Sequence, residues 1–158
     1  MHEVSKNLWV GSQHDLTNLP EDWSVVHAAK EPWHREAVGY TTQGAPVQHP
    51  EYLVALRGNR LCLNLVDADD PKFIHSGVMR QAINFIAEQL ALDKQVLVHC
   101  NQGGSRGPGV AMAYLAPQLD REFEAAEQTF IKLYPNYAPH PGMRGWLRSN
   151  WDYLNQCR

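Results

Sequence analysis

The sequence lacks long runs of lysine and arginine, long apolar segments and closely spaced cysteine pairs. Its 14 basic and 17 acidic residues give a formal net charge of −3 over 158 residues, which argues against the basic surface of a nucleic-acid-binding protein. No stretch approaches the ~18 apolar residues of a membrane span, and no basic segment with an apolar core opens the chain. We therefore expect neither membrane association nor a secretory signal.

The spacing of the cysteines and histidines argues against structural disulfides and against a metal site. The three cysteines, Cys62, Cys100 and Cys157, are widely spaced, which predicts free thiols in a reducing compartment, with the cytoplasm as the expected location. The eight histidines include no HxxxH or HxH pair, so we expect no metal site and no cofactor of that kind. An apolar fraction of 44% is ordinary for a globular protein, and the length suits a single domain over residues 1–158.

Short apolar runs alternate with amphipathic stretches. Buried strands are expected at residues 8–10, 25–29, 61–66 and 96–99. Helices are expected after an N-cap at Ser76, after the glycine-rich loop at 103–109, after a cap at Asp120, and over 143–154. The last two strands are almost continuously apolar, as in a parallel sheet covered on both faces. This order predicts an α/β fold.

The segment with the clearest chemistry is residues 96–106, VLVHCNQGGSR. An apolar strand ends at Cys100, a short glycine-containing loop follows, and Arg106 begins a predicted helix. Backbone N–H groups of such a loop can face inward and bind an anion, and the helix N-terminus presents its positive dipole end there. This setting favours the thiolate form of a cysteine, and the planar fork of an arginine matches two phosphoryl oxygens. The pattern predicts that Cys100 attacks phosphorus while Arg106 holds the phosphoryl group.

The remaining loop residues are expected to contribute backbone N–H groups to the same site. The predicted phosphate-binding residues are Asn101, Gln102, Gly103, Gly104, Ser105 and Arg106. Ser105 has a second interpretation, because serine is a common helix N-cap. The uncharged loop is unfavourable for polyphosphorylated ligands.

The string HCNQGGSR resembles the HCxxGxxR signature of the protein tyrosine phosphatases, and more particularly of the dual-specificity phosphatases. The similarity continues through residues 7–12, 113–115 and 135–136, and it covers most of the chain except about 30–58. It implies a central four- to five-stranded, mainly parallel sheet flanked by helices, no cofactor, and phosphomonoester hydrolysis through a phosphocysteine intermediate. The implied substrate is a phosphorylated protein or a small phosphomonoester. In this family the histidine at position 99 orients the loop by hydrogen bonding.

The leaving oxygen of a phosphomonoester needs a proton, which a carboxylic acid usually supplies. Residues 61–71, LCLNLVDADDP, join a predicted strand to an acidic turn. Counting back from the end of the following helix, the resemblance places the general acid at Asp69, with Asp67 as the second candidate. Asp70 precedes a proline and is interpreted as a turn former.

Gly107 departs from the family pattern, which usually has serine or threonine directly after the arginine. The hydroxyl there supports the leaving thiolate, and a lost hydrogen bond to a charged group costs about 1.5–3 kcal/mol. We therefore expect slow breakdown and a detectable phosphocysteine, with Ser105 or Gln102 as candidates to replace the hydroxyl. The alternative function is a catalytically weak phosphate- or phosphopeptide-binding protein. A sulfurtransferase, whose loop also follows a cysteine, does not match the overall sequence pattern.

Two further groups of residues have alternative interpretations. Residues 30–59 are rich in proline and glycine, with only 52–56 predicting a short helix, and segments of this length are often functional. Within them, Trp33, His34, Arg35 and Tyr40 either contact the substrate or, for the two aromatics, pack the segment onto the protein. Cys62 either forms a reversible disulfide with the nucleophile or is a small core residue.

Overall fold

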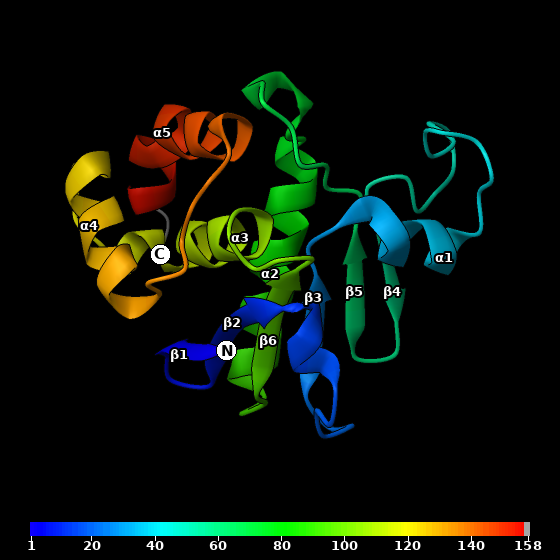
Figure 1. Cartoon of the computed structure of the whole chain (residues 1–158), viewed down its shortest axis with the longest axis horizontal. Helices are drawn as coiled ribbons and strands as arrows, with labels where there is room; N and C mark the ends of the chain where they lie inside the picture. The colour runs from blue at the N-terminus through cyan, green and yellow to red at the C-terminus, as the bar shows by residue number, and fades with distance from the viewer. Residues whose placement is uncertain (157–158) are drawn as a thin grey trace.

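The computed structural model describes residues 1–156, so the predicted free thiol of Cys157 lies outside the described residues. A six-stranded sheet runs in the order β1-β2-β6-β3-β5-β4 (Figure 1). The strands are β1 His2–Ser5, β2 Leu8–Ser12, β3 Ser24–His27, β4 Val54–Arg57, β5 Arg60–Leu63 and β6 Val96–Cys100. The four central strands are parallel and the two edge strands are antiparallel to their neighbours. The predicted α/β fold with a mainly parallel sheet is confirmed, but the sheet has six strands and not the four to five that were expected.

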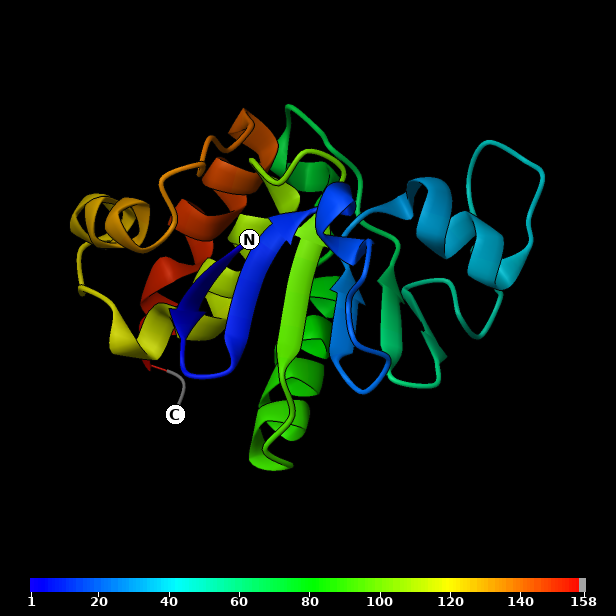
Figure 2. The same cartoon turned by 60° about the horizontal axis from the view of Figure 1, so that its bottom comes forward.

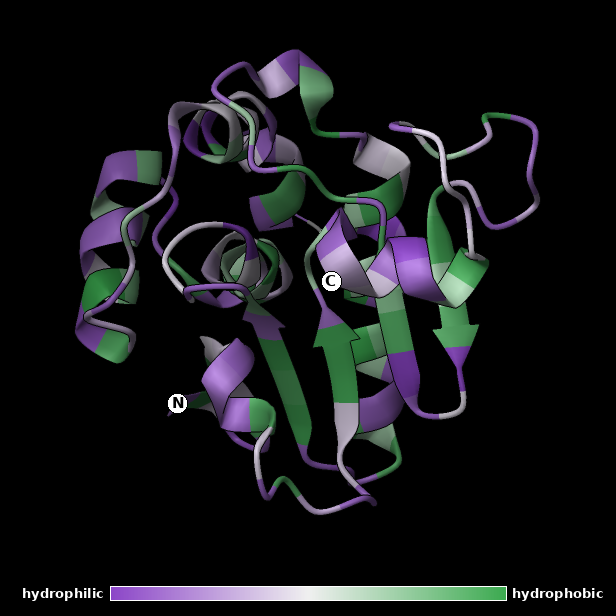
Figure 3. Cartoon of the chain, turned by 45° about the vertical axis from the view of Figure 1, so that its right-hand side comes forward, coloured by the Kyte–Doolittle hydropathy of each residue, from purple (hydrophilic) through white to green (hydrophobic). Residues whose placement is uncertain are grey.

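The four longer helices cover one face of this sheet (Figure 2). The helices are α1 Arg35–Val38, α2 Ser76–Ala91, α3 Arg106–Leu115, α4 Phe123–Leu133 and α5 Pro141–Gln156, with single turns at Gln13–Leu16, Pro71–Phe73 and Ala116–Gln118 and a kinked turn at Lys30–His34. The central strands are mostly hydrophobic and the helices carry alternating hydrophobic and hydrophilic stripes (Figure 3). No helix within residues 1–156 combines the length and apolar character needed to cross a membrane.

Strand register decides which side chains face the helices. Val10, Val26 and Val98 lie in one row across β2, β3 and β6 and join the core beneath the helices. Because successive side chains of a strand alternate between faces, the next row, which contains His27 and His99, faces the other side. On that side the kinked segment Lys30–His34 packs against β5.

The helix predicted at residues 52–56 is wrong, because β4 forms a hairpin with β5 there. Leu56 pairs with Leu61, and Gly58 in the turn has a φ of +62°, a left-handed value that favours glycine. Val54 to Leu56 is too short an apolar run to distinguish helix from strand by periodicity. Pairing with β5, the strand that follows it, decides the conformation of this segment, and local propensity does not.

Two predicted helix caps are also displaced. Helix α2 begins at Ser76, but the capping residue is His75, whose ring accepts a hydrogen bond from Gly77 N. Helix α4 begins at Phe123 rather than directly after Asp120, whose carboxylate accepts a hydrogen bond from the Thr129 hydroxyl. Both helices exist where the periodicity placed them, and only their first turns differ from prediction.

Candidate active site

The loop between β6 and α3 has the geometry of an anion site. Cys100 is the last residue of β6 and is 3% exposed, and Arg106 is the first residue of α3. None of the backbone N–H groups from Asn101 to Ser105 donates a hydrogen bond to any residue within 1–156. Unpaired N–H groups in succession are rare in a folded protein unless a ligand or water satisfies them.

The carbonyl groups of the same loop are held by the surrounding structure. The hydrogen bonds are His99 Nδ1 to Cys100 O at 3.0 Å, Gln13 N to Asn101 O at 3.1 Å, Tyr134 Oη to Gly103 O at 2.7 Å and Ala138 N to Gly104 O at 2.8 Å. The C=O and N–H of a trans peptide point in opposite directions. Fixing these carbonyls therefore turns the following N–H groups toward the other side of the loop.

Tyr134 and Gly103 meet at the tightest point of this loop. Burial raises the pKa of Tyr134 to about 12, so its hydroxyl keeps the proton that it donates to Gly103 O. Gly103 has a φ of +83°, and a β-carbon there would lie 2.9 Å from the Tyr134 hydroxyl and 3.0 Å from Gly11 O. Glycine is therefore required at position 103 for both conformation and space.

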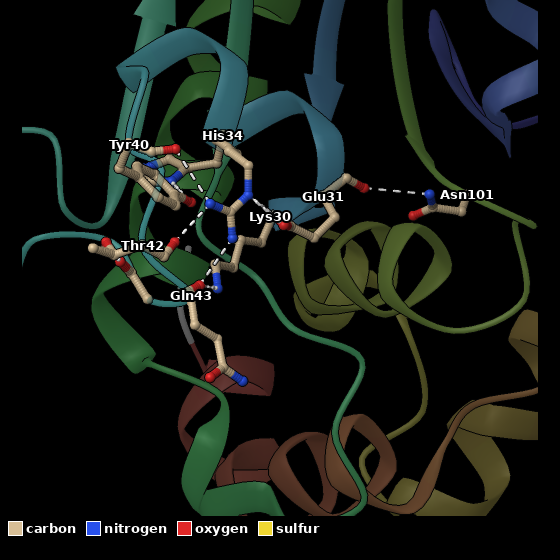
Figure 4. Close-up of polar contacts among 9 residues, drawn as sticks. Lys30, Glu31, His34, Tyr40, Thr42, Gln43 and Asn101 are labelled. Atoms are coloured by element: carbon tan, nitrogen blue, oxygen red, sulfur yellow. Dashed lines mark hydrogen bonds and ion pairs between the residues drawn. The ribbon is translucent and has the colours of Figure 1, made fainter.

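The guanidinium of Arg106 lies over the start of the loop. Its Nη1 donates to Leu65 O at 3.1 Å and its Nη2 donates to Asn101 Oδ1 at 2.8 Å. The Asn101 amide nitrogen donates in turn to Glu31 O at 3.3 Å (Figure 4). Two of the five N–H donors of Arg106 are thus used to orient the fork, which leaves the others for an anion.

The segment following Lys30 is fixed around the guanidinium of Arg35. Arg35 bonds the Glu31 carboxylate and the backbone carbonyls of Tyr40, Thr42 and Gln43. The Lys30 ammonium donates to the same Gln43 carbonyl at 2.6 Å (Figure 4). Lys30, Glu31 and Arg35 thereby hold this segment at the side of the loop where Asn101 contacts Glu31.

The four residues proposed to contact a substrate from this segment have structural partners. His34 is buried between the Tyr40 hydroxyl at 2.9 Å and Glu51 O at 2.8 Å. Trp33 stacks on His27 with a centroid distance of 5.3 Å and an interplanar angle of 5°. Trp33 and Tyr40 therefore pack this segment onto the protein, which is the second of their two interpretations. Arg35 is occupied by its bonds to Glu31 and to backbone carbonyls.

His99 occupies the orienting position expected of it, and the structure adds partners that the sequence did not indicate. Its Nδ1 bonds Cys100 O, and its Nε2 lies 2.6 Å from His27 Nδ1. Arg60 Nη1 lies 3.5 Å from the remaining nitrogen of His27. His27 sits within a predicted apolar strand 72 residues before His99, so no local spacing could have paired them.

The three candidate carboxylates after β5 differ in their partners. Asp67 Oδ1 lies 2.9 Å from His140 Nδ1. Asp70 caps the turn at Pro71–Phe73 by accepting from Lys72 N at 2.9 Å, as its interpretation as a turn former required. Asp69 is exposed and has no hydrogen bond or ion pair with a residue in 1–156. Asp69 is therefore the carboxyl of the three that is free to turn toward a ligand.

Cys62 lies too far from Cys100 for the proposed disulfide. Both Cys62 and His99 pair with His27 on neighbouring strands, which places their Cα atoms two strand spacings, about 10 Å, apart. Cys100 follows His99 and faces the opposite side of the sheet. A disulfide requires Cα atoms within about 7 Å, so Cys62 is a buried core residue whose pKa is raised by that burial.

The packing of α3 against β6 leaves little space for a side chain at position 107. A β-carbon there would lie 3.1 Å from both Cys100 N and His99 C. The helix start is therefore pressed against the end of β6. A serine at this position would need the backbone to move by a few tenths of an ångström.

A cavity lies away from this loop. Its volume is about 800 Å³, and it lies between α2, α3 and α5, lined in part by Arg80, Tyr114 and Trp146. Within residues 1–156, no three or more His, Cys, Asp or Glu side chains are grouped so that they could hold a metal ion.

No protein-family model matches the sequence, and no curated protein matches it. Solved structures match nearly the whole chain. DUSP15 has a TM-score of 0.67 and 19% identity, covering 99% of this chain and 90% of its own. PTPMT1 has a TM-score of 0.64 and 16% identity, and the match covers 97% of this chain and 94% of PTPMT1. Human DUSP28 has a TM-score of 0.61 and 20% identity, and the match covers 99% of this chain and 98% of DUSP28. The chain therefore has the fold of these solved phosphatase structures.

Proposed function

We propose that the protein hydrolyses phosphomonoesters through a phosphocysteine intermediate, acting on phosphorylated tyrosine, serine or threonine in proteins. The observation that carries this proposal is the run of unpaired N–H groups from Asn101 to Ser105 between a cysteine and an arginine. A phosphoryl group offers several acceptor oxygens, and phosphoryl transfer depends mainly on positioning and charge stabilisation.

In the first step, the Cys100 thiolate attacks phosphorus and the bond to the leaving oxygen breaks. Asp69 gives its proton to that oxygen, so the product leaves as a neutral alcohol or phenol. The loop N–H groups and Arg106 hold the equatorial oxygens. Their fixed orientation means that little reorganisation is needed as charge develops.

In the second step, water attacks the phosphocysteine. The Asp69 carboxylate accepts a proton from that water, the sulfur–phosphorus bond breaks, and Cys100 leaves as a thiolate. Gly107 supplies no hydroxyl to this thiolate, which supports the expectation that the second step limits turnover. The sum of the two steps is hydrolysis of one phosphomonoester.

The uncharged loop also bears on the substrate. PTPMT1, one of the structural matches, has been solved in complex with PI(5)P. The loop residues between Cys100 and Arg106 carry no charge here, which favours a substrate with a single phosphoryl group. Phosphorylated proteins fit that requirement.

Turnover of p-nitrophenyl phosphate tests the proposal. We expect Cys100→Ser to reduce turnover to background and Arg106→Lys to reduce it by about 10²-fold or more, because lysine keeps the charge but loses the fork. Cys62→Ser is the matched thiol control and should retain activity. Acid-quenched wild type should gain the mass of one PO3 group, and Cys100→Ser should not.

The second candidate function is phosphopeptide binding without turnover, which Gly107 favours because the hydroxyl that usually supports the leaving thiolate is missing. Saturable binding of a phosphopeptide by a wild type that releases no phosphate would establish it. Release of phosphate from that peptide by the wild type, and not by Cys100→Ser, would establish the hydrolase instead.

A further inference from the structure

His27 and His99 form a buried pair on the face of the sheet opposite the Cys100 side chain. The two rings are 2% and 0% exposed as residues, and their centroids lie 4.8 Å apart at an interplanar angle of 88°. Their facing nitrogens, His27 Nδ1 and His99 Nε2, are 2.6 Å apart. At that distance one nitrogen must carry a proton and the other must accept it.

Burial keeps both rings neutral. It lowers the pKa of His27 to about 3 and that of His99 to about 4, against an ordinary value of 6.5. Trp33 stacks on His27 and meets the His99 ring edge-on at 4.7 Å, which excludes water from this side. A neutral imidazole has one donor nitrogen and one acceptor nitrogen. Fixing the proton on one nitrogen of either ring therefore fixes the proton positions of both rings.

The proton positions follow from Cys100 O, a carbonyl oxygen that can only accept a hydrogen bond. Cys100 O is 3.0 Å from His99 Nδ1, so this nitrogen carries the proton and His99 Nε2 is the acceptor. His27 Nδ1 must then donate to it, which leaves His27 Nε2 as an acceptor facing Arg60 Nη1 at 3.5 Å. Arginine can only donate, so the contact with Arg60 requires the same proton positions as the contact with Cys100 O.

The other tautomer of His99 would disturb the phosphate loop. Its Nδ1 would then carry a lone pair 3.0 Å from the lone pairs of Cys100 O. Two acceptors at that distance repel, and the peptide between Cys100 and Asn101 would rotate to relieve the contact. Because the two ends of a peptide turn together, the N–H of Asn101 would rotate away from the position fixed above.

We propose that His27 is a positioning residue whose Nδ1–H holds His99 in the tautomer that fixes the Cys100 carbonyl and thereby orients the Asn101 N–H. Arg60 supports it by donating to His27 Nε2. The tautomer of His99 is a property of the folded protein, and only the kinetic consequence rests on the proposed phosphatase activity.

The direct test is ¹⁵N NMR of the histidine side chains in the full chain at neutral pH. In the wild type we expect His99 as the Nδ1–H tautomer, and we expect the same for His27. His27→Phe keeps a ring to stack on Trp33 but removes the donor, so His99 should lose this tautomer in whole or in part. His27→Asn is the matched control, because its amide N–H can occupy the place of Nδ1 and should preserve the His99 signal.

Kinetics with p-nitrophenyl phosphate give the second readout. His27→Phe should lower kcat by about 10-fold with a smaller change in KM, and His27→Asn should recover most of the loss, since one hydrogen bond is at stake. The proposal is overturned if wild-type His99 carries its proton on Nε2, or if His27→Phe leaves both tautomer and kcat unchanged. A wild type without turnover overturns the proposed function alone, and the NMR comparison still decides the role of His27.

Discussion

The hydroxyl oxygen of Ser105 accepts a hydrogen bond from the backbone N–H of His140, at 2.9 Å. The neighbouring Ala138 N donates to Gly104 O at 2.8 Å, so two consecutive loop residues are joined to the chain entering α5. The His140 ring also lies 2.9 Å from Asp67, which belongs to the acidic turn after β5. The β6–α3 loop and the acidic turn are therefore held by the same short segment, residues 138–140.

Ser105→Ala removes one of these links. We expect the free energy of unfolding to fall by about 1 kcal/mol, because the His140 N–H loses its partner. We also expect kcat/KM for p-nitrophenyl phosphate to fall several-fold as the loop loosens. Urea unfolding and steady-state kinetics measure the two effects, and Ser105→Thr, which keeps the hydroxyl, serves as the control. Unchanged stability and rate in Ser105→Ala would show that the link has no role.

Asp69→Asn should separate the two acid candidates. Because Asp69 has no partner in the described chain and Asp67 is paired with His140, we expect Asp69→Asn to lower kcat on a phosphotyrosine peptide by about 10²-fold. The loss should be smaller with p-nitrophenyl phosphate, whose leaving group needs less protonation. Asp67→Asn should change either rate only a few-fold. A larger loss in Asp67→Asn would reverse the assignment.

The sequence predicts those strands, loops and helices whose conformation is determined by residues close together in the chain. An apolar run ending at Cys100, glycines after it and a helical period beyond Arg106 all act within a few residues, and the strand, loop and helix are present as expected. The sequence predicts a helix at residues 52–56, where the structure has the edge strand Val54–Arg57, because the conformation there depends on pairing with β5. Local propensity carries little information about such pairing.

The parts of the site that were missed depend on contacts between distant residues. The sequence offers Ser105 as a helix cap, but the Ser105 side chain makes no capping hydrogen bond. Its hydroxyl accepts a hydrogen bond from His140 N instead. His27 lies in a buried strand, where a histidine would ordinarily be a packed core residue. Only the register of β3 against β6 brings its ring to His99.

Gly107→Ser tests whether the missing hydroxyl limits turnover. The added hydroxyl should speed phosphocysteine breakdown by about 10-fold, the lower end expected for a hydrogen bond to a charged group. The tight contact of a β-carbon with Cys100 N is present equally in Gly107→Ala, which makes alanine the matched control. Rapid-quench measurement should show a smaller burst of phosphoenzyme in the serine variant than in the alanine variant. Equal bursts would remove Gly107 as the cause of slow breakdown.

The buried histidine pair predicts how stability depends on pH. Burial lowers the pKa values of His27 and His99 to about 3 and about 4, below the ordinary 6.5. As pH falls below that ordinary value, the unfolded chain binds protons on these rings that the folded protein does not. The free energy of unfolding therefore falls with falling pH, until the folded protein also binds them.

His27→Phe isolates the contribution of one ring. Between about pH 6 and 4.5 each such histidine adds a slope of about 1.4 kcal/mol per pH unit, and the variant should lose one of these contributions. Urea unfolding at several pH values gives the slope directly. An equal slope in wild type and His27→Phe would mean that His27 is protonated in the folded protein, and a protonated His27 could not accept a hydrogen bond from Arg60.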